Sequence, residues 1–218
     1  MNITKLGTSM QDKTIEILTF TNGPFGVNSY LLSSGNYSVI IDPGHDCSEL
    51  IDFTEKRHEH PSLILFTHGH IDHVCGTNQI IGIYPSINII SGFEDADLLS
   101  NIKMQAKMFS LPEPELISST KYIKDNEDIV CGDIIIRPFH TPGHSMGSYS
   151  FLCGNALFSG DVIFRESIGR TDLFGGNHSI LMKTLREKIM TLPDSCIIYP
   201  GHGEPTTIGH ERKNNPYI

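Results

Sequence analysis

The chain has 218 residues, of which 39% are hydrophobic and 19% are charged, and its formal net charge is −9. These values fit a globular protein with a buried core and exclude a disordered or fibrous chain. The acidic balance disfavours nucleic-acid and anionic-lipid partners, and no apolar run approaches the roughly 18 residues of a membrane span. The polar N-terminus lacks the apolar core of a signal peptide, so we expect a cytoplasmic protein.

Hydrophobic periodicity and turn signals predict strands with fewer, interleaved helices. In chain order we expect strands at 14–20, 28–33 and 37–42, a helix at 47–58, a strand at 62–68, a helix starting near Asp72, a helix at 93–110, strands at 133–140, 148–153 and 156–161, a helix at 178–192 and a strand at 196–201. Without internal repeats, this order predicts one α/β or α+β domain over residues 1–218. The helix at 93–110 either covers a substrate site or packs as an ordinary helix.

The stretch "FTHGHIDHVCG", residues 66–76, concentrates metal-binding side chains at the end of a predicted strand. Residues two apart on a strand point the same way, so His68 and His70 can present both imidazoles to one point. After the chain turns, Asp72 and His73 can serve a second point nearby. One short loop can therefore supply ligands for two ions.

Three later stretches place one such side chain each at the end of a predicted strand, next to glycine: "FHTPGHSMG" with His144, "FSGD" with Asp161 and "YPGHG" with His202. Together with the loop they offer seven candidates, too many for one zinc, which takes about four ligands. Imidazole and carboxylate donors fit two divalent ions, and zinc, iron and manganese all suit this donor set. His140 lies on a strand near His144, and we expect it to support the site.

These motifs, in this order, resemble the metallo-β-lactamase superfamily, whose pattern is HxHxDH followed by His, Asp and His. The resemblance runs from about residue 14 to the end and implies an α+β fold, a four-layer αββα sandwich with metals at one edge of the two sheets. It implies that His68, His70 and His144 bind the first metal. Asp72, His73 and His202 would bind the second metal, and Asp161 would bridge both. Because the true β-lactamases lack this aspartate, Asp161 argues against antibiotic hydrolysis, and His70 argues against flavodiiron chemistry.

Two longer stretches, 157–177 and 199–218, resemble the single-domain glyoxalase II-like enzymes, close to hydroxyacylglutathione hydrolases. The chain ends soon after His202, without the C-terminal helical domain that contacts glutathione in two-domain members. Arg165 and Arg170 are candidate contacts to an anionic thiol. Cys75 stands where the family commonly has glycine or alanine, and we expect it to fill space.

The resemblance implies hydrolysis of a small-molecule thioester such as S-lactoylglutathione by a metal-bridging hydroxide, with Asp72 as the catalytic residue that orients the hydroxide and relays a proton. Two other reactions remain open. The motif "GRTD", residues 169–172, also resembles persulfide dioxygenases, in which His68, His144 and Asp161 would hold a single iron. Hydrolysis of another small ester, lactone or phosphoester is the other alternative. The native metal and the oligomeric state stay undetermined.

Overall fold

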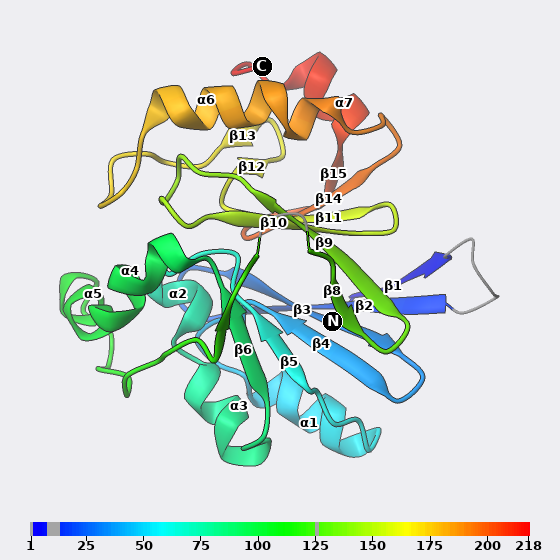
Figure 1. The fold of residues 1–218 in the computed structure, drawn as a ribbon, viewed down its shortest axis with the longest axis vertical. Coiled ribbons are helices and arrows are strands. Elements are labelled where there is room, and N and C mark those ends of the chain that lie inside the picture. Colours follow the sequence, from blue (N-terminus) through cyan, green and yellow to red (C-terminus); the bar gives the residue numbers. More distant parts are fainter. Residues whose placement is uncertain (1, 8–13, 125–126) are drawn as a thin grey trace.

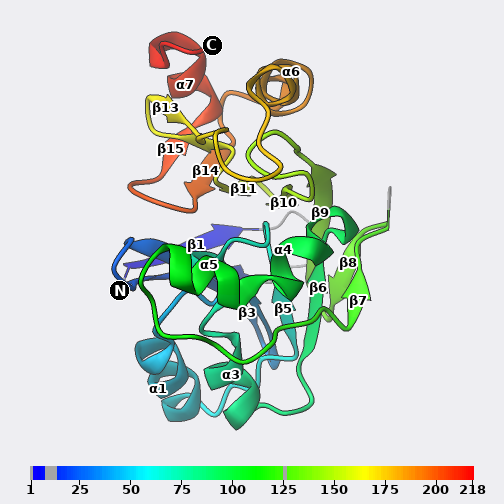
Figure 2. The same cartoon turned by 90° about the vertical axis from the view of Figure 1, so that its left-hand side faces the viewer.

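The computed structural model describes residues 2–7, 14–124 and 127–218. Two β-sheets lie face to face, and helices cover the outer face of each sheet (Figures 1 and 2). The expected α+β fold, a four-layer αββα sandwich, is thereby confirmed. Within the described ranges, no helix combines the length and apolarity that crossing a bilayer requires.

The first sheet has seven strands in sequence order: β1 (Asn2–Gly7), β2 (Thr14–Asn22), β3 (Val27–Ser34), β4 (Tyr37–Ile41), β5 (Leu63–Leu65), β6 (Asn88–Ser91) and β7 (Lys121–Tyr122). Pairing is antiparallel from β1 to β4 and parallel from β4 to β7. The helices α1 (Ser48–Lys56), α2 (Ile71–Val74) and α3 (Thr77–Ile83) lie in the connections that the parallel pairs require.

The second sheet has the order β15-β14-β11-β10-β9-β8. Its strands are β8 (Ile129–Cys131), β9 (Ile134–His140), β10 (Tyr149–Cys153), β11 (Ala156–Gly160), β14 (Ile197–Pro200) and β15 (Thr206–Thr207). A small hairpin, β12 (Ile163–Phe164) with β13 (Ser167–Ile168), follows β11. On the outer face lie α6 (His178–Glu187), a 3₁₀ turn η2 (Ile189–Thr191) and α7 (Ile208–Asn214) (Figure 1).

Three apolar clusters hold the four layers together. Alternation along β3 places Tyr30 and Leu32 between the two sheets, where Phe158 packs, and turns Leu31 toward the helices of the first sheet. Leu181 and Leu185 of α6 pack on the outer face of the second sheet. Because both faces of β3 are covered, all eight of its residues are buried, and its sequence does not alternate between apolar inward and charged outward residues.

The structure differs from the predicted elements in several places. It contains strands that were not predicted, among them β6 and β8, and it ends the helix expected at 178–192 at Glu187, before the 3₁₀ turn η2. The expected helix at 93–110 is broken into a 3₁₀ turn η1 (Phe93–Asp95), α4 (Ala96–Ser100) and α5 (Ile102–Met108). The break lies at Asn101, whose side-chain Nδ2 donates to the Asp97 carbonyl at 2.8 Å and ends α4. The strand expected at 62–68 ends at Leu65, because the Thr67 backbone N–H donates instead to the Asp42 carboxylate at 2.8 Å.

Candidate metal centre

Three histidines converge at the C-terminal end of β5. His144 Nε2, from the loop between β9 and β10, lies 3.2 Å from His68 Nε2 and 2.8 Å from His70 Nδ1. All three side chains are buried. Two nitrogen ligands of a tetrahedral zinc, each about 2.0–2.1 Å from the ion, lie about 3.3 Å apart. The separation of His144 and His68 matches this value, and that of His144 and His70 is about 0.5 Å shorter. The loop after β5, rather than the strand expected to reach His68, brings the His68 and His70 imidazoles to one point.

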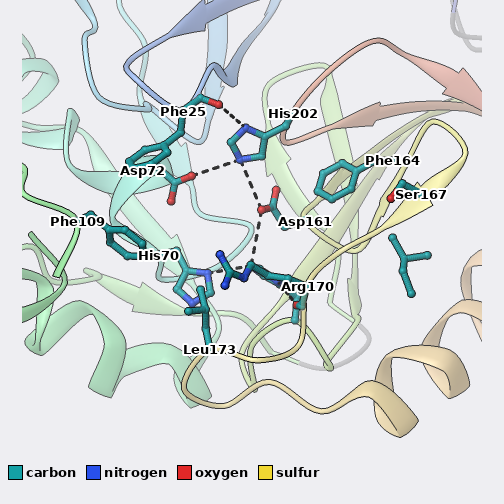
Figure 3. A pocket seen from close by; sticks show the side chains of 12 residues that line it. Phe25, His70, Asp72, Phe109, Asp161, Phe164, Ser167, Arg170, Leu173 and His202 are labelled. Carbon is teal, nitrogen blue, oxygen red and sulfur yellow. Dashed lines mark hydrogen bonds and ion pairs between the residues drawn. The ribbon is translucent and has the colours of Figure 1, made fainter.

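A second cluster is formed by Asp72, His73 and His202. Asp72 Oδ2 lies 3.3 Å from His202 Nε2 and 3.7 Å from His73 Nε2. His202 comes from the loop after β14, and its Nδ1 contacts the Phe25 carbonyl at 3.1 Å, which leaves Nε2 directed into the site (Figure 3). This cluster contains the second set of residues named from the family pattern.

Asp161, at the end of β11, lies between the two clusters. Its Oδ2 is 3.5 Å from His202 Nε2 (Figure 3) and 3.7 Å from His144 Nε2, and its Oδ1 is 3.4 Å from His73 Nε2. Gly201 allows this approach, because a Cβ there would lie 2.7 Å from the His73 ring and closer still to the Asp161 carboxylate. One carboxylate thus faces both groups of imidazoles.

The described residues leave two polar atoms buried at this centre without a hydrogen-bond partner, His73 Nε2 and Asp161 Oδ1. Buried polar groups almost always have a partner, and an unsatisfied one costs about 1–3 kcal/mol. Both atoms are metal-ligand types, and they lie 3.4 Å apart, which is longer than an ordinary N–H···O hydrogen bond. The donor set therefore fits the two divalent ions that the family pattern implies.

Asp42 supports this centre and was missed by the sequence analysis. Its Oδ2 lies 2.8 Å from His73 Nδ1 and accepts from Thr67 Oγ1 at 2.6 Å. With these contacts made, Asp42 orients the His73 ring and leaves Nε2 free for the site, as carboxylates do behind metal-binding histidines. The signal was available in the sequence, since Asp42 ends a buried strand directly before "PG".

Asp95 and Gln105 hold the histidine loop from the helical side. The buried Asp95 carboxylate accepts from the backbone N–H groups of Gly69 and Gly147, at 2.8 and 2.7 Å. The buried Gln105 amide accepts from Ile71 N at 3.1 Å and donates to the Gly69 carbonyl at 3.1 Å. Both residues lie in the segment for which the sequence predicts a helix. A side chain that bonds to the backbone of a distant loop produces no recognisable spacing in the sequence, so neither role was predicted.

Two further contacts position the imidazoles. His144 Nδ1 lies 2.8 Å from the Arg170 carbonyl, which fixes the ring with Nε2 toward the site. His140 Nε2 lies 2.9 Å from the Met146 carbonyl, and its ring packs on Tyr149. His140 thus shapes the loop that carries His144, in agreement with the supporting role expected for it.

Burial and neighbouring charges shift the pKa values of the titratable groups at this centre in different directions. Burial and the neighbouring His144 lower the pKa of His70 to about 3, and burial with His73 lowers that of His68. Burial also opposes the charged form of His73, yet Asp161, Asp72 and Asp42 raise its pKa well above the usual value. His73 in turn lowers the pKa of Asp161 against the effect of burial. His68 and His70 are therefore neutral, the form that binds a metal, whereas His73 must give up a proton before it can bind one.

A cavity of about 410 Å³ opens over both clusters (Figure 3). It is lined by Phe25, His70, Asp72, Phe109, His144, Asp161, Phe164, Ser167, Ile168, Arg170, Leu173 and His202. Of the two expected substrate contacts, Arg170 lines the cavity, whereas Arg165 is exposed and lies outside this lining. The Arg170 guanidinium forms a two-pronged ion pair with Asp172 at 2.7 and 2.8 Å. Cys75 packs against the core, and burial raises the pKa of its thiol to about 12, which agrees with a space-filling role.

Two curated relatives align with nearly the whole chain. A protein of Bacillus subtilis named probable metallo-hydrolase YqgX is 34% identical over 213 residues, which cover 90% of this chain and 94% of the relative. Hydroxyacylglutathione hydrolase GloC of Haemophilus influenzae is 33% identical over 184 residues, covering 83% and 87% of the two chains. Their names support assignment of this chain to the metal-dependent hydrolases.

Solved structures share the fold closely. BLEG-1, described as a B3 metallo-beta-lactamase, superposes with a TM-score of 0.86 at 33% identity over 92% of this chain and 98% of its own. TTHA1623, solved in a di-iron-bound form, superposes with a TM-score of 0.85 at 30% identity over 92% and 100%. The profile of the metallo-beta-lactamase superfamily matches residues 22–202, which span every residue of both clusters. The chain therefore belongs to the metallo-beta-lactamase superfamily.

Proposed function

We propose that this protein is a glyoxalase II-like hydrolase that cleaves the thioester of a small thiol at a centre of two metal ions. The observation that carries the proposal is the position of Asp161, whose carboxylate faces both imidazole clusters at the floor of the cavity. The likeness to hydroxyacylglutathione hydrolase GloC supports the thioester as the bond to test first.

His68, His70 and His144 would hold one ion, and Asp72, His73 and His202 the other, with Asp161 shared between them. When bound, the ions lower the pKa of a water ligand from about 15.7 to about 7 and polarise the substrate carbonyl. Zinc suits this donor set, and iron or manganese are the alternatives. The di-iron form of TTHA1623 supports iron as one of the metals to test.

The chain's own residues contribute charge, orientation and exclusion of bulk water. Burial opposes the ionised form of Asp72, but His73 and His202 outweigh it and lower its pKa, so this carboxylate can orient water and accept its proton. Phe25 and Phe109 line the opening above it. In the reaction, water oxygen bonds to the thioester carbon, the carbon–sulfur bond breaks, and the proton from water leaves with the thiol.

Substitution of Asp161 tests the proposal. We expect Asp161→Ala to abolish hydrolysis of S-lactoylglutathione while circular dichroism shows a folded protein. Asp72→Asn should lower kcat by about 10²- to 10⁴-fold, the usual contribution of a general base. Asp52→Ala, on the exposed surface of α1, is the matched control and should retain full activity. Full turnover by Asp161→Ala would falsify the shared-carboxylate role.

Parallel substrates separate this reaction from its rivals. Oxygen uptake on glutathione persulfide with one iron per chain, and no thioester cleavage, would identify a dioxygenase instead. Cleavage of a β-lactam without thioester cleavage would favour the activity named for BLEG-1, to which this chain is 33% identical. We expect neither, since both clusters and the shared aspartate are complete in this chain.

A further inference from the structure

A second cavity, of about 500 Å³, lies directly beside the metal centre. It shares His70, Phe109 and Leu173 with the first cavity, so the two spaces meet at one wall. These three side chains lie between the two spaces or at their common rim, so a group attached to a substrate at the metal clusters reaches the second cavity by passing them.

The second cavity is walled mainly by apolar side chains. Met104 and Met108, one helical turn apart on α5, are 60% and 67% exposed, and Phe174 on the facing loop is 68% exposed. The hydrogen bonds of Gln105 to the histidine loop fix α5 in this orientation. Large apolar side chains exposed together beside an active site are the usual features of a ligand-binding groove.

The side chains around the two cavities offer little positive charge to a strongly anionic occupant. Among the described residues that line either cavity, Arg170 is the only lysine or arginine, and Asp172 already pairs with it. Asp97 adds another negative charge to the second cavity. The carboxylates of glutathione would thus meet acidic or apolar side chains without a free cationic partner.

We propose that the second cavity binds the apolar acyl chain of the substrate, and that acyl thioesters with a chain of several carbons are preferred over S-lactoylglutathione. This inference rests on the proposed function, because it places the thioester carbonyl at the metal centre. The chain passes between Phe109 and Leu173 and lies against the two methionines. The small polar lactoyl group would leave this cavity unused.

A series of thioesters measures the preference. Acetyl, butanoyl, hexanoyl and octanoyl thioesters of N-acetylcysteamine, a neutral thiol, are compared on the zinc-loaded enzyme. Burial of one methylene group favours binding about fourfold, and in a half-open cavity we expect kcat/KM to rise about two- to threefold per methylene. The double variant Met104→Ala, Met108→Ala should flatten this rise. Ile83→Ala, an exposed apolar residue on α3, is the control and should leave it unchanged.

A binding measurement keeps the inference independent of the reaction. With ¹³C-methyl-labelled methionine, octanoate but not acetate should shift the Met104 and Met108 signals, assigned with the single Met→Leu variants. Absence of any thioester cleavage would end the proposed function, while these shifts would still support the apolar site. If octanoate shifts neither signal, or kcat/KM stays flat with chain length while thioesters are cleaved, the apolar site is refuted.

Discussion

Asp95→Asn tests how the fold holds the candidate metal centre in place. Asp95 is the last residue of the 3₁₀ turn η1, directly before α4, and its carboxylate joins the histidine loop to the loop of His144. Its Oδ2 accepts from Gly69 N at 2.8 Å and Ser145 Oγ at 2.7 Å, and its Oδ1 accepts from Gly147 N at 2.7 Å. Asparagine has the same shape but only one accepting oxygen, so either Gly69 N or Gly147 N must face an NH₂ group.

The expected magnitude follows from that single loss. A buried backbone N–H left without an acceptor costs about 1–3 kcal/mol. Burial raises the pKa of Asp95, so removing its charge offsets part of this cost, and we expect a net loss near 2 kcal/mol. For a chain of this length, that lowers Tm by about 4–8 °C. Because Gly69 separates His68 from His70, zinc affinity should also fall by about 10- to 100-fold.

Two measurements on each variant provide the test. Thermal unfolding of metal-free protein gives the stability change, and zinc competition with a coloured chelator gives the affinity change. Glu94→Gln is the matched control, because Glu94 is the exposed neighbour of Asp95 and should change neither value. An Asp95→Asn protein with both wild-type Tm and wild-type zinc affinity would show that this carboxylate does not hold the loops.

Three further predictions concern pH, metal binding and the contact between the sheets. The free energy of unfolding of the metal-free protein should fall as pH falls from about 6.5 toward 3, because His68 and His70 take up a proton in the unfolded chain but not in the folded one. Each histidine contributes a slope that approaches about 1.4 kcal/mol per pH unit. Urea unfolding at several pH values measures this slope, and a free energy that does not change with pH would contradict the prediction. Zinc binding at pH 7 should release about one proton from His73, measured in weak buffer with an indicator dye, and no release would refute its charged state. Tyr30→Phe should cost about 1 kcal/mol in urea unfolding by removing the 2.6 Å bond to the Pro200 carbonyl, and an unchanged unfolding midpoint would count against that bond.

The central strands of both sheets were predictable because burial leaves a simple pattern in the sequence, whereas short strands such as β6 and β8 were not predicted. Each of the eight expected strands overlaps an observed one. The buried runs of β3 and β11 are bounded at both ends by residues typical of turns. The segment 93–110 was less predictable, since its apolar stripe continues through the position where Asn101 ends α4. The spacing of apolar residues predicts where a helix packs, but it does not reveal a polar side chain that ends the helix partway along the apolar stripe.

The residues of the candidate site also differ in whether the sequence alone could reveal them. His68 and His70 were recognisable from their spacing after a buried apolar run, although β5 ends at Leu65 and both histidines lie in the loop that follows it. His144, Asp161 and His202 were recognisable because each lies near a glycine at or after the end of a predicted strand. The supporting residues Asp95 and Gln105 were not, because they hold backbone groups of a loop distant in sequence. The apolar cavity also escaped prediction, because Met104 and Leu173 meet only after α5 and the loop before α6 fold together.

Hydrolysis measured during zinc titration of the metal-free protein tests the central claim most directly. Zinc is added in known equivalents, and cleavage of S-lactoylglutathione and of an octanoyl thioester is followed after each addition. The two-cluster geometry predicts no activity without metal and a rise that reaches its plateau only at two zinc ions per chain. A plateau at one zinc ion per chain, or activity without any metal, would contradict a thioesterase built on two metal ions.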